Sequence, residues 1–195
     1  METLAGPLAN GPITPNALTL FSLAVSLGVF FLYAGGFFFW AGLALLLSGL
    51  LDTLDGTVAR LSGSASRFGA LLDSSADRVA DFLILAGLLI HYRNDVTFYA
   101  VLFVIAGSYM VSYVKARAES LGTIRVVGFM QRPERIIFLA AASLAVPVAE
   151  AWLPSISPDA PLILILWFMA VSTNLTAIHR LWSARQDLGR AEGNQ

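Results

Sequence analysis

The most regular feature of the chain is an alternation of long apolar runs with short polar connections. A membrane-spanning helix needs about 20 consecutive, mostly apolar residues. Runs of about this length predict helices over residues 13–33, 37–61, 67–92, 96–119, 136–153 and 162–182. Thr14-Pro15-Asn16 is typical of a helix start, and Gly35-Gly36 of a helix end. The pattern therefore predicts an all-α, polytopic membrane protein with six transmembrane helices.

The amino-acid composition excludes an ordinary soluble domain. Of the 195 residues, 57% are hydrophobic and 13% are charged, whereas soluble domains carry about 25% charged residues. We expect a single six-helix domain over residues 1–185 and a polar, frayed tail over 186–195. Residues 1–12 contain no Lys or Arg, so we expect neither a cleaved signal peptide nor a basic amphipathic surface helix there. The chain has no cysteine, which excludes disulfides and thiolate metal sites.

Basic residues gather on one side of the predicted spans, and only Arg93 falls on the other side. Because Lys and Arg concentrate in cytoplasmic loops, the basic side is predicted to face the cytoplasm. Both termini and any site on this side would then be cytoplasmic, with the protein in the cell membrane. The residues on the basic side are Arg60, Arg67, Lys115, Arg117, Arg125, Arg132, Arg135, Arg180, Arg185 and Arg190.

Aspartates interrupt the second and third predicted spans near the polar loop that joins them. Asp52 and Asp55 are three residues apart, and Asp73 and Asp77 are four apart. Each pair therefore shares one face of a helix, and Asp81 follows one turn later. A helical hairpin would bring the two pairs together slightly inside the membrane boundary.

A cluster of like charges at membrane depth needs compensation, because each aspartate there costs about 2.5 to 3.5 kcal/mol on insertion scales. One explanation is a purely structural ion-pair network with Arg60, Arg67 and Arg78. The other is a site for hard divalent cations such as Mg²⁺ or Mn²⁺, which prefer carboxylate oxygens and can clamp phosphate oxygens. The acids outnumber the bases and their spacing repeats on two helices, which favours the metal site.

Written out, the acidic segment is Asp52-Thr-Leu-Asp55-Gly56-Thr-Val-Ala59-Arg60, then eight residues, then Gly69-Ala-Leu-Leu-Asp73-Ser-Ser-Ala-Asp77. It resembles the signature of the CDP-alcohol phosphatidyltransferase family, Asp-x₂-Asp-Gly-x₂-Ala-Arg-x₈-Gly-x₃-Asp-x₃-Asp, at all eight defined positions. The resemblance implies an enzyme of phospholipid biosynthesis. Such an enzyme transfers a lipid phosphate from a CDP-lipid, such as CDP-diacylglycerol, to the hydroxyl of a small alcohol and releases CMP.

The resemblance also implies roles for individual residues. Asp52, Asp55 and Asp73 would bind two Mg²⁺ or Mn²⁺ ions, and Asp77 would be both a further ligand and the general base. The implied CDP-lipid site consists of Asn16, Thr19, Asp52, Gly56, Ala59, Arg60 and Ser66. For the small residues of this set, simple tight packing of helices remains an alternative. A homodimer is implied as well.

A second set of basic residues suggests the acceptor. The set is Lys115, Arg117, Arg132, Arg135 and Arg180. The positive-inside bias and attraction to anionic lipids could explain several of them, but guanidinium groups also bind phosphate bidentately. The segments 112–119 and 128–135, with 76–81, look like the phosphatidylinositol-phosphate synthase branch of the family. That branch would make the acceptor a phosphorylated alcohol, with myo-inositol phosphate first and glycerol 3-phosphate or another alcohol as alternatives.

Two other classes of protein are alternatives to this enzyme. An ion-coupled membrane transporter also places acids within the membrane, but it would favour internal repeats and broken helices, which the sequence does not suggest. A scaffold protein would not need a cluster of acids suited to metal binding. We expect no nucleic-acid partner.

Overall fold

The computed structural model describes residue 6 and residues 14–122, 128–153 and 155–193. Six long helices contain most of these residues. They are α2 (Pro15–Ala34), α3 (Phe38–Leu61), α4 (Arg67–His91), α5 (Thr97–Ser120), α6 (Arg132–Trp152) and α7 (Ala160–Gly193). The described residues contain no strand. The prediction of an all-α fold is confirmed.

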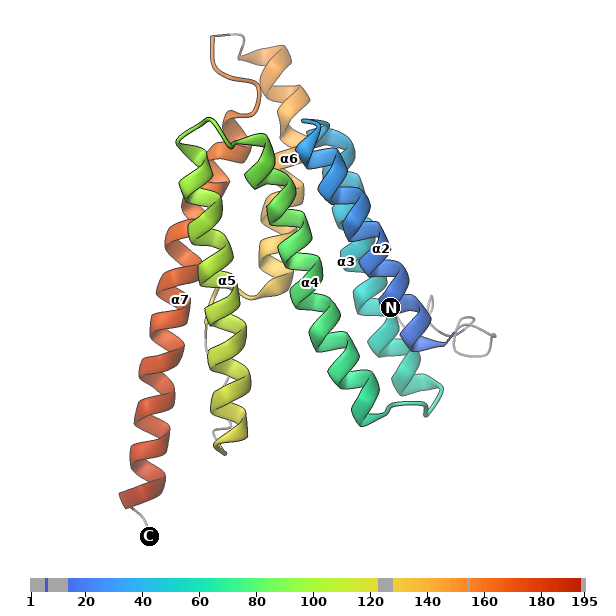
Figure 1. Cartoon of the computed structure of the whole chain (residues 1–195), viewed down its shortest axis with the longest axis vertical. Coiled ribbons are helices and arrows are strands. Elements are labelled where there is room, and N and C mark those ends of the chain that lie inside the picture. Colours follow the sequence, from blue (N-terminus) through green and yellow to red (C-terminus); the bar gives the residue numbers. More distant parts are fainter. Residues whose placement is uncertain (1–5, 7–13, 123–127, 154, 194–195) are drawn as a thin grey trace.

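Five of these helices are long and apolar enough to span a membrane: α2, α3, α5, α6 and residues 160–190 of α7. The exception is α4, whose first half carries the aspartates. It nevertheless joins the end of α3 to the start of α5, which lie at opposite ends of the bundle (Figure 1). It must therefore cross the same thickness as its neighbours. The protein is a multi-pass membrane protein with one partly polar helix.

Local sequence explains where the helices begin and end. Thr14 caps α2 by accepting a hydrogen bond from the Ala17 N–H, and Ser66 caps α4 by accepting one from the Gly69 N–H at 2.9 Å. Gly36, with a φ of 77°, allows the tight turn between α2 and α3. The largest departure from expectation is α7, which continues as a helix to Gly193 instead of fraying after residue 185.

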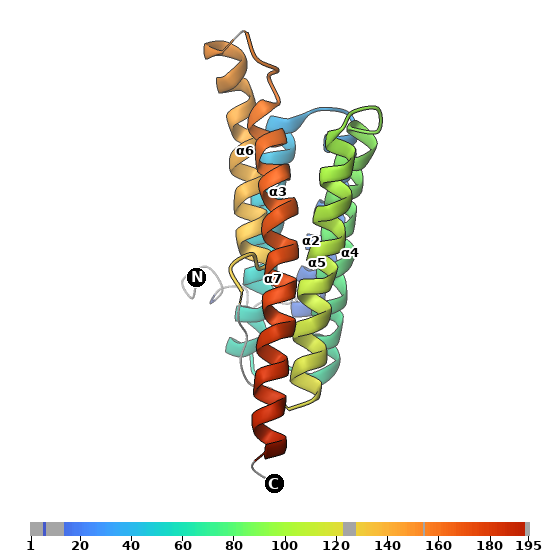
Figure 2. The ribbon, with the colours of Figure 1, turned by 90° about the vertical axis from the view of Figure 1, so that its left-hand side faces the viewer.

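The helices form a ring in the order α2, α4, α5, α7, α6, α3, with each packed against two neighbours. Figures 1 and 2 show the ring from two sides. We call the end where α3, α5 and α7 finish and α2 and α4 begin the basic end, since Arg60, Arg67, Lys115, Arg117 and Arg185 lie there.

The apolar core fills the half of the bundle away from the basic end. It includes Val29 and Tyr33 of α2, Leu88 of α4 and Leu162 of α7, all fully buried. The buried polar residues mostly lie in the other half, including Thr19, Ser22, Ser48, Asp55, Arg135 and Arg180. Apolar packing thus holds one half of the bundle together and leaves the other half for polar groups.

Helix α6 begins well inside the bundle and not at the basic end. In Figures 1 and 2 its first turn lies about midway along α5 and α7. Arg132 and Pro133 begin this helix, so its basic first turn is set at the depth of the aspartates. Among the described helices, α6 therefore does not extend along the half of the bundle at the basic end.

Candidate active site

Three of the four predicted metal ligands meet at one point. Asp52 of α3 and Asp73 and Asp77 of α4 each offer a carboxylate oxygen, and these atoms lie within 4.8 Å of one another. Oxygen ligands sit about 2.0 to 2.6 Å from a Mg²⁺ or Ca²⁺ ion, so two on opposite sides are about 4 to 5 Å apart. The three carboxylates are therefore close enough to share one divalent cation.

The fourth predicted ligand, Asp55, is held in a different way. Its side chain is buried and accepts a 2.6 Å hydrogen bond from the Thr19 hydroxyl of α2. It does not belong to the group of three. Asp55 shares a helix face with Asp52, but its carboxylate is directed at α2, whereas that of Asp52 contacts Arg132 of α6.

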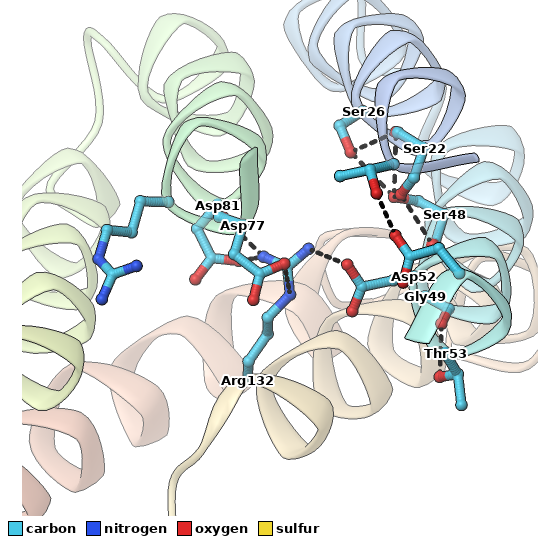
Figure 3. A network of polar contacts seen from close by, with 12 residues as sticks. Ser22, Ser26, Ser48, Gly49, Asp52, Thr53, Asp77, Asp81 and Arg132 are labelled. Atoms are coloured by element: carbon cyan, nitrogen blue, oxygen red, sulfur yellow. Dashed lines mark hydrogen bonds and ion pairs between the residues drawn. The ribbon is translucent and has the colours of Figure 1, made fainter. Parts of the chain in front are cut away.

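Arg132, at the start of α6, reaches between the aspartates of α3 and α4 (Figure 3). Its Nη1 donates to Asp81 at 2.6 Å and to the Asp77 carbonyl oxygen at 2.7 Å, and its Nη2 lies 3.4 Å from Asp52. Its Nε is 3.1 Å from Asp77 Oδ1, a charge contact without hydrogen-bond alignment. This one cation offsets part of the negative charge of three aspartates.

Asp81 connects the two arginines of the α6 first turn. Its carboxylate accepts hydrogen bonds from both Arg132 and Arg135. The side chain of Arg135 is only 5% exposed, so its orientation depends on this carboxylate and on the Met130 carbonyl oxygen at 3.5 Å. The sequence pattern contained the signal, because Asp73, Asp77 and Asp81 repeat every four residues, but we assigned Asp81 no role in the site.

A hollow of about 360 Å³ lies on one side of the carboxylate cluster, and we call it the acceptor hollow. Among the basic residues predicted to bind an acceptor phosphate, four line it: Lys115, Arg132, Arg135 and Arg180. Arg180 is buried and donates to the Val111 carbonyl oxygen at 2.7 Å. The fifth predicted residue, Arg117, does not line this hollow and lies in a separate groove between α5 and α7.

A second hollow, of about 210 Å³, lies on the other side of the cluster, and we call it the nucleotide hollow. Its walls include Asn16, Thr19, Gly56, Ala59, Arg60 and Ser66, together with Asp55 and Asp73. All the residues predicted to bind the CDP-lipid therefore line this hollow except Asp52, which lines the acceptor hollow. A side chain at Gly69 would crowd this hollow, because a Cβ there would lie 3.1 Å from Ser66 Oγ and 3.5 Å from Asn16 Oδ1.

The carboxylates thus stand between two hollows of different character. Asp52 and Asp77 face the acceptor hollow, and Asp55 and Asp73 face the nucleotide hollow. One hollow carries five cationic side chains, the four predicted ones and that of Arg78, and the other carries small residues, amide and hydroxyl groups and Arg60. Two substrates bound on opposite sides would meet at the carboxylates, which is a suitable arrangement for group transfer.

Residues 12–175 match the family model described as CDP-alcohol phosphatidyltransferase. The chain belongs to this family. Its membership decides against the ion-coupled transporter and the scaffold protein as alternatives.

Several relatives within the family have names that specify a single reaction. The chain is 37% identical over 120 residues to phosphatidylinositol phosphate synthase of Mycobacterium tuberculosis, a match that covers 59% of this chain and 52% of the relative. It is 34% identical over 191 residues to archaetidylinositol phosphate synthase of Pyrococcus horikoshii, covering 96% of this chain and 92% of the relative. The chain spans about half the length of the mycobacterial relatives that it matches first.

Solved structures of the M. tuberculosis synthase have the same fold. The crystal structure with CDP-DAG bound superposes with a TM-score of 0.81 at 31% identity, covering 93% of this chain and 94% of that one. A second crystal structure, in complex with manganese and citrate, superposes with a TM-score of 0.80 at 30% identity, covering 93% and 87%.

Proposed function

We propose that this protein transfers a substituted phosphate from a CDP-linked lipid, such as CDP-diacylglycerol, to the hydroxyl of a small phosphorylated alcohol and releases CMP. The observation that carries the proposal is the position of Asp52, Asp73 and Asp77 between the nucleotide hollow and the acceptor hollow. Family membership and the CDP-DAG bound in the M. tuberculosis structure support it.

The donor would lie with its cytidine and diphosphate in the nucleotide hollow. Arg60, which lines this hollow, is steadied by a 3.2 Å hydrogen bond to the Thr57 hydroxyl and offers the remaining guanidinium N–H groups to phosphate. The small residues Gly56 and Ala59 leave room for the nucleotide beside the backbone. Thr19, while its hydroxyl is engaged by Asp55, acts as a positioning residue for that carboxylate.

Asp52, Asp55, Asp73 and Asp77 would hold two divalent ions, Mg²⁺ or Mn²⁺. The close approach of three of these carboxylates fits such ions, and the manganese bound by the M. tuberculosis relative supports the assignment. When bound, the ions neutralise the diphosphate and make CMP a better leaving group. Arg132, which contacts Asp52 and Asp77, would offset the negative charge of these carboxylates that the ions leave uncompensated.

Bond making and breaking then follow from the arrangement. The acceptor hydroxyl oxygen attacks the phosphorus that bears the lipid, and its proton passes to Asp77, which faces the acceptor hollow. The bond from that phosphorus to the bridging diphosphate oxygen breaks, and CMP leaves with the bonding electrons. The product is the lipid phosphodiester of the acceptor alcohol.

The cations of the acceptor hollow favour a phosphorylated acceptor, and myo-inositol phosphate is our first choice because of the names of the relatives. Lys115, Arg135 and Arg180 would bind its phosphate, since most donors of Arg132 are directed at aspartates. Glycerol 3-phosphate is the main alternative.

We also propose that the basic end faces the cytoplasm of a cell membrane and that the protein is a homodimer.

The acceptor can be identified by measuring CMP release from CDP-diacylglycerol by the purified protein. Myo-inositol phosphate, glycerol 3-phosphate, myo-inositol and serine would be compared, each with Mg²⁺, with Mn²⁺ and with a chelator. We expect CMP release only with a divalent metal and a phosphorylated acceptor. Activity confined to myo-inositol or serine would refute the phosphate-binding role of the acceptor hollow, and activity with the chelator would refute the metal site.

A further inference from the structure

Arg117 faces away from the site that its neighbours form. Lys115 and Arg117 are two residues apart on α5, and each residue of an α-helix turns by about 100°, so their side chains point to nearly opposite sides. Lys115 lines the acceptor hollow, whereas Arg117 lines a groove of about 710 Å³ between α5 and α7. A role for Arg117 must therefore be sought in that groove.

The groove combines an apolar wall with two guanidinium groups. Ile178, Leu181 and Trp182 line it and are 64%, 61% and 57% exposed. Arg117 of α5 and Arg185 of α7 also line it, and no acidic residue is among its lining residues. The exposed apolar side chains alone would suit any membrane lipid, but the two positive charges favour a negative ligand.

The groove lies at the level where a lipid headgroup would be found. Arg117 is in the last turn of α5, and the lining residues of the groove belong to the C-terminal parts of α5 and α7, which finish at the basic end (Figure 1). Tryptophan and arginine side chains commonly mark the boundary between hydrocarbon and water. Ile178 lies one turn deeper along α7 than Trp182, so a ligand with a charged head and an apolar tail matches the order of the residues.

We propose that this groove is a binding site for one anionic phospholipid of the surrounding membrane, separate from the donor and acceptor sites. The lipid phosphate lies between Arg117 and Arg185, and an acyl chain follows Trp182, Leu181 and Ile178. A zwitterionic lipid fits the apolar wall equally well, but its ammonium or choline group reduces the attraction to the two guanidinium groups. The expected preference for an anionic lipid is about 30-fold, which corresponds to about 1 kcal/mol for each basic residue.

Trp182 provides a direct test, because bromine atoms on acyl chains quench tryptophan fluorescence on contact. The other tryptophans, Trp40, Trp152 and Trp167, would be replaced by Phe. The protein would then be titrated, in phosphatidylcholine nanodiscs, with brominated phosphatidylglycerol or brominated phosphatidylcholine. We expect half-maximal quenching at an about 30-fold lower mole fraction of phosphatidylglycerol.

Paired variants separate a specific site from general attraction to the basic end. R117Q/R185Q should abolish the difference between the two lipids, and R117K/R185K, which keeps both charges, should retain it. R67Q/R190Q removes two exposed cations outside the groove and should also retain the difference. Size-exclusion chromatography would confirm that each variant is folded.

Three outcomes would overturn the proposal. They are equal quenching by the two lipids, selectivity that survives R117Q/R185Q, and displacement of the anionic lipid by soluble myo-inositol phosphate, which would assign the groove to a free phosphate. The measurement uses neither a CDP-lipid nor turnover. If the quenching experiment contradicted the lipid site, the proposed transferase function would be unaffected. If the assay of CMP release contradicted the transferase function, the lipid site would be unaffected.

Discussion

At the scale of single residues, the site is governed by the balance of charge around Arg132. This guanidinium contacts Asp52, Asp77 and Asp81, and Asp81 in turn contacts Arg135. Removing one member of a buried ion pair leaves an uncompensated charge and typically costs about 3 to 5 kcal/mol. Asp81 is therefore the one carboxylate of the described residues that helps to orient both arginines at the acceptor hollow.

Replacing Asp81 by Asn should weaken acceptor binding more than donor binding. The amide keeps the shape of the side chain but removes the charge that orients Arg132 and Arg135. We expect the KM for the phosphorylated acceptor to rise about tenfold or more, a loss of at least about 1.4 kcal/mol, with a smaller change in the KM for the CDP-lipid. Steady-state kinetics with each substrate varied in turn would measure both.

The matched control is Asp95→Asn in the exposed turn before α5, where Asp95 accepts a hydrogen bond from the Thr97 N–H at 2.7 Å. This variant should leave both KM values unchanged. A D81N protein with a lower Tm but an unchanged acceptor KM would reduce Asp81 to a structural ion-pair partner.

Replacing Asp77 by Asn should lower kcat by about 10²- to 10⁴-fold, the usual contribution of a general base. Asp77 belongs to the predicted metal-ligand cluster and, like Asp52, faces the acceptor hollow. Mn²⁺ affinity, followed by the rise in Tm that the metal causes, would separate the loss of a ligand from the loss of a base. A folded D77N protein with unchanged turnover would remove the base assignment.

At the scale of helices, close packing of α2 against its neighbours sets the position of the acids. Ser22 and Ser26 of α2 meet Ser48 of α3, with Ser48 Oγ 3.2 Å from Ser22 Oγ and 2.9 Å from Ser26 Oγ (Figure 3). On the other side, Gly87 allows α4 to approach α2, since a Cβ there would lie 2.5 Å from the Phe30 carbonyl oxygen. Small and hydroxyl-bearing residues are the usual means of helix association in membranes.

Replacing Gly87 by Ala should destabilise the fold. The added methyl group would meet the backbone of α2 and not a flexible side chain, and overpacking of this kind costs about 1 to 3 kcal/mol. Gly28→Ala is the matched control, because a Cβ at Gly28 meets nothing within 4 Å. Thermal unfolding in detergent should show a lower Tm for G87A than for G28A, and equal Tm values would contradict the packing argument.

At the scale of the whole molecule, the bundle is divided between an apolar half and a polar half. The core cluster holds one half together, and the acceptor and nucleotide hollows lie in the other half, along which α6 does not extend (Figures 1 and 2). In the proposed reaction, a lipid-linked donor and a water-soluble acceptor must reach the same carboxylates. Two hollows near one end of a membrane bundle would provide that access without exposing polar groups to the hydrocarbon.

The orientation of the bundle can be tested because the chain has no cysteine, so each introduced cysteine is unique. In intact cells, Asn94→Cys, at the end opposite the basic end, should react with a membrane-impermeant maleimide. Ser64→Cys, between α3 and α4, should react only after the cells are permeabilised. This follows from the excess of Lys and Arg at the basic end, and the reverse labelling pattern would place the proposed active site outside.

Local and periodic features of the sequence determined much of this protein. Apolar runs of membrane-spanning length predicted the six helices within a few residues at most ends, because the 20-residue requirement is a property of the membrane. The i, i+3 and i, i+4 spacing of the aspartates predicted that α3 and α4 would present carboxylates to one point, because helix geometry alone decides which residues share a face.

Contacts between distant helices were decided only by the tertiary structure. The sequence grouped Arg117 with the residues predicted to bind the acceptor, yet the rotation of α5 turns it into a different groove. Nor could the pattern show that Thr19 holds Asp55 or that Arg132 directs its donors at three aspartates. These facts depend on how six helices rotate and shift against one another. That arrangement is fixed by side-chain packing over the whole bundle, and no single segment encodes it.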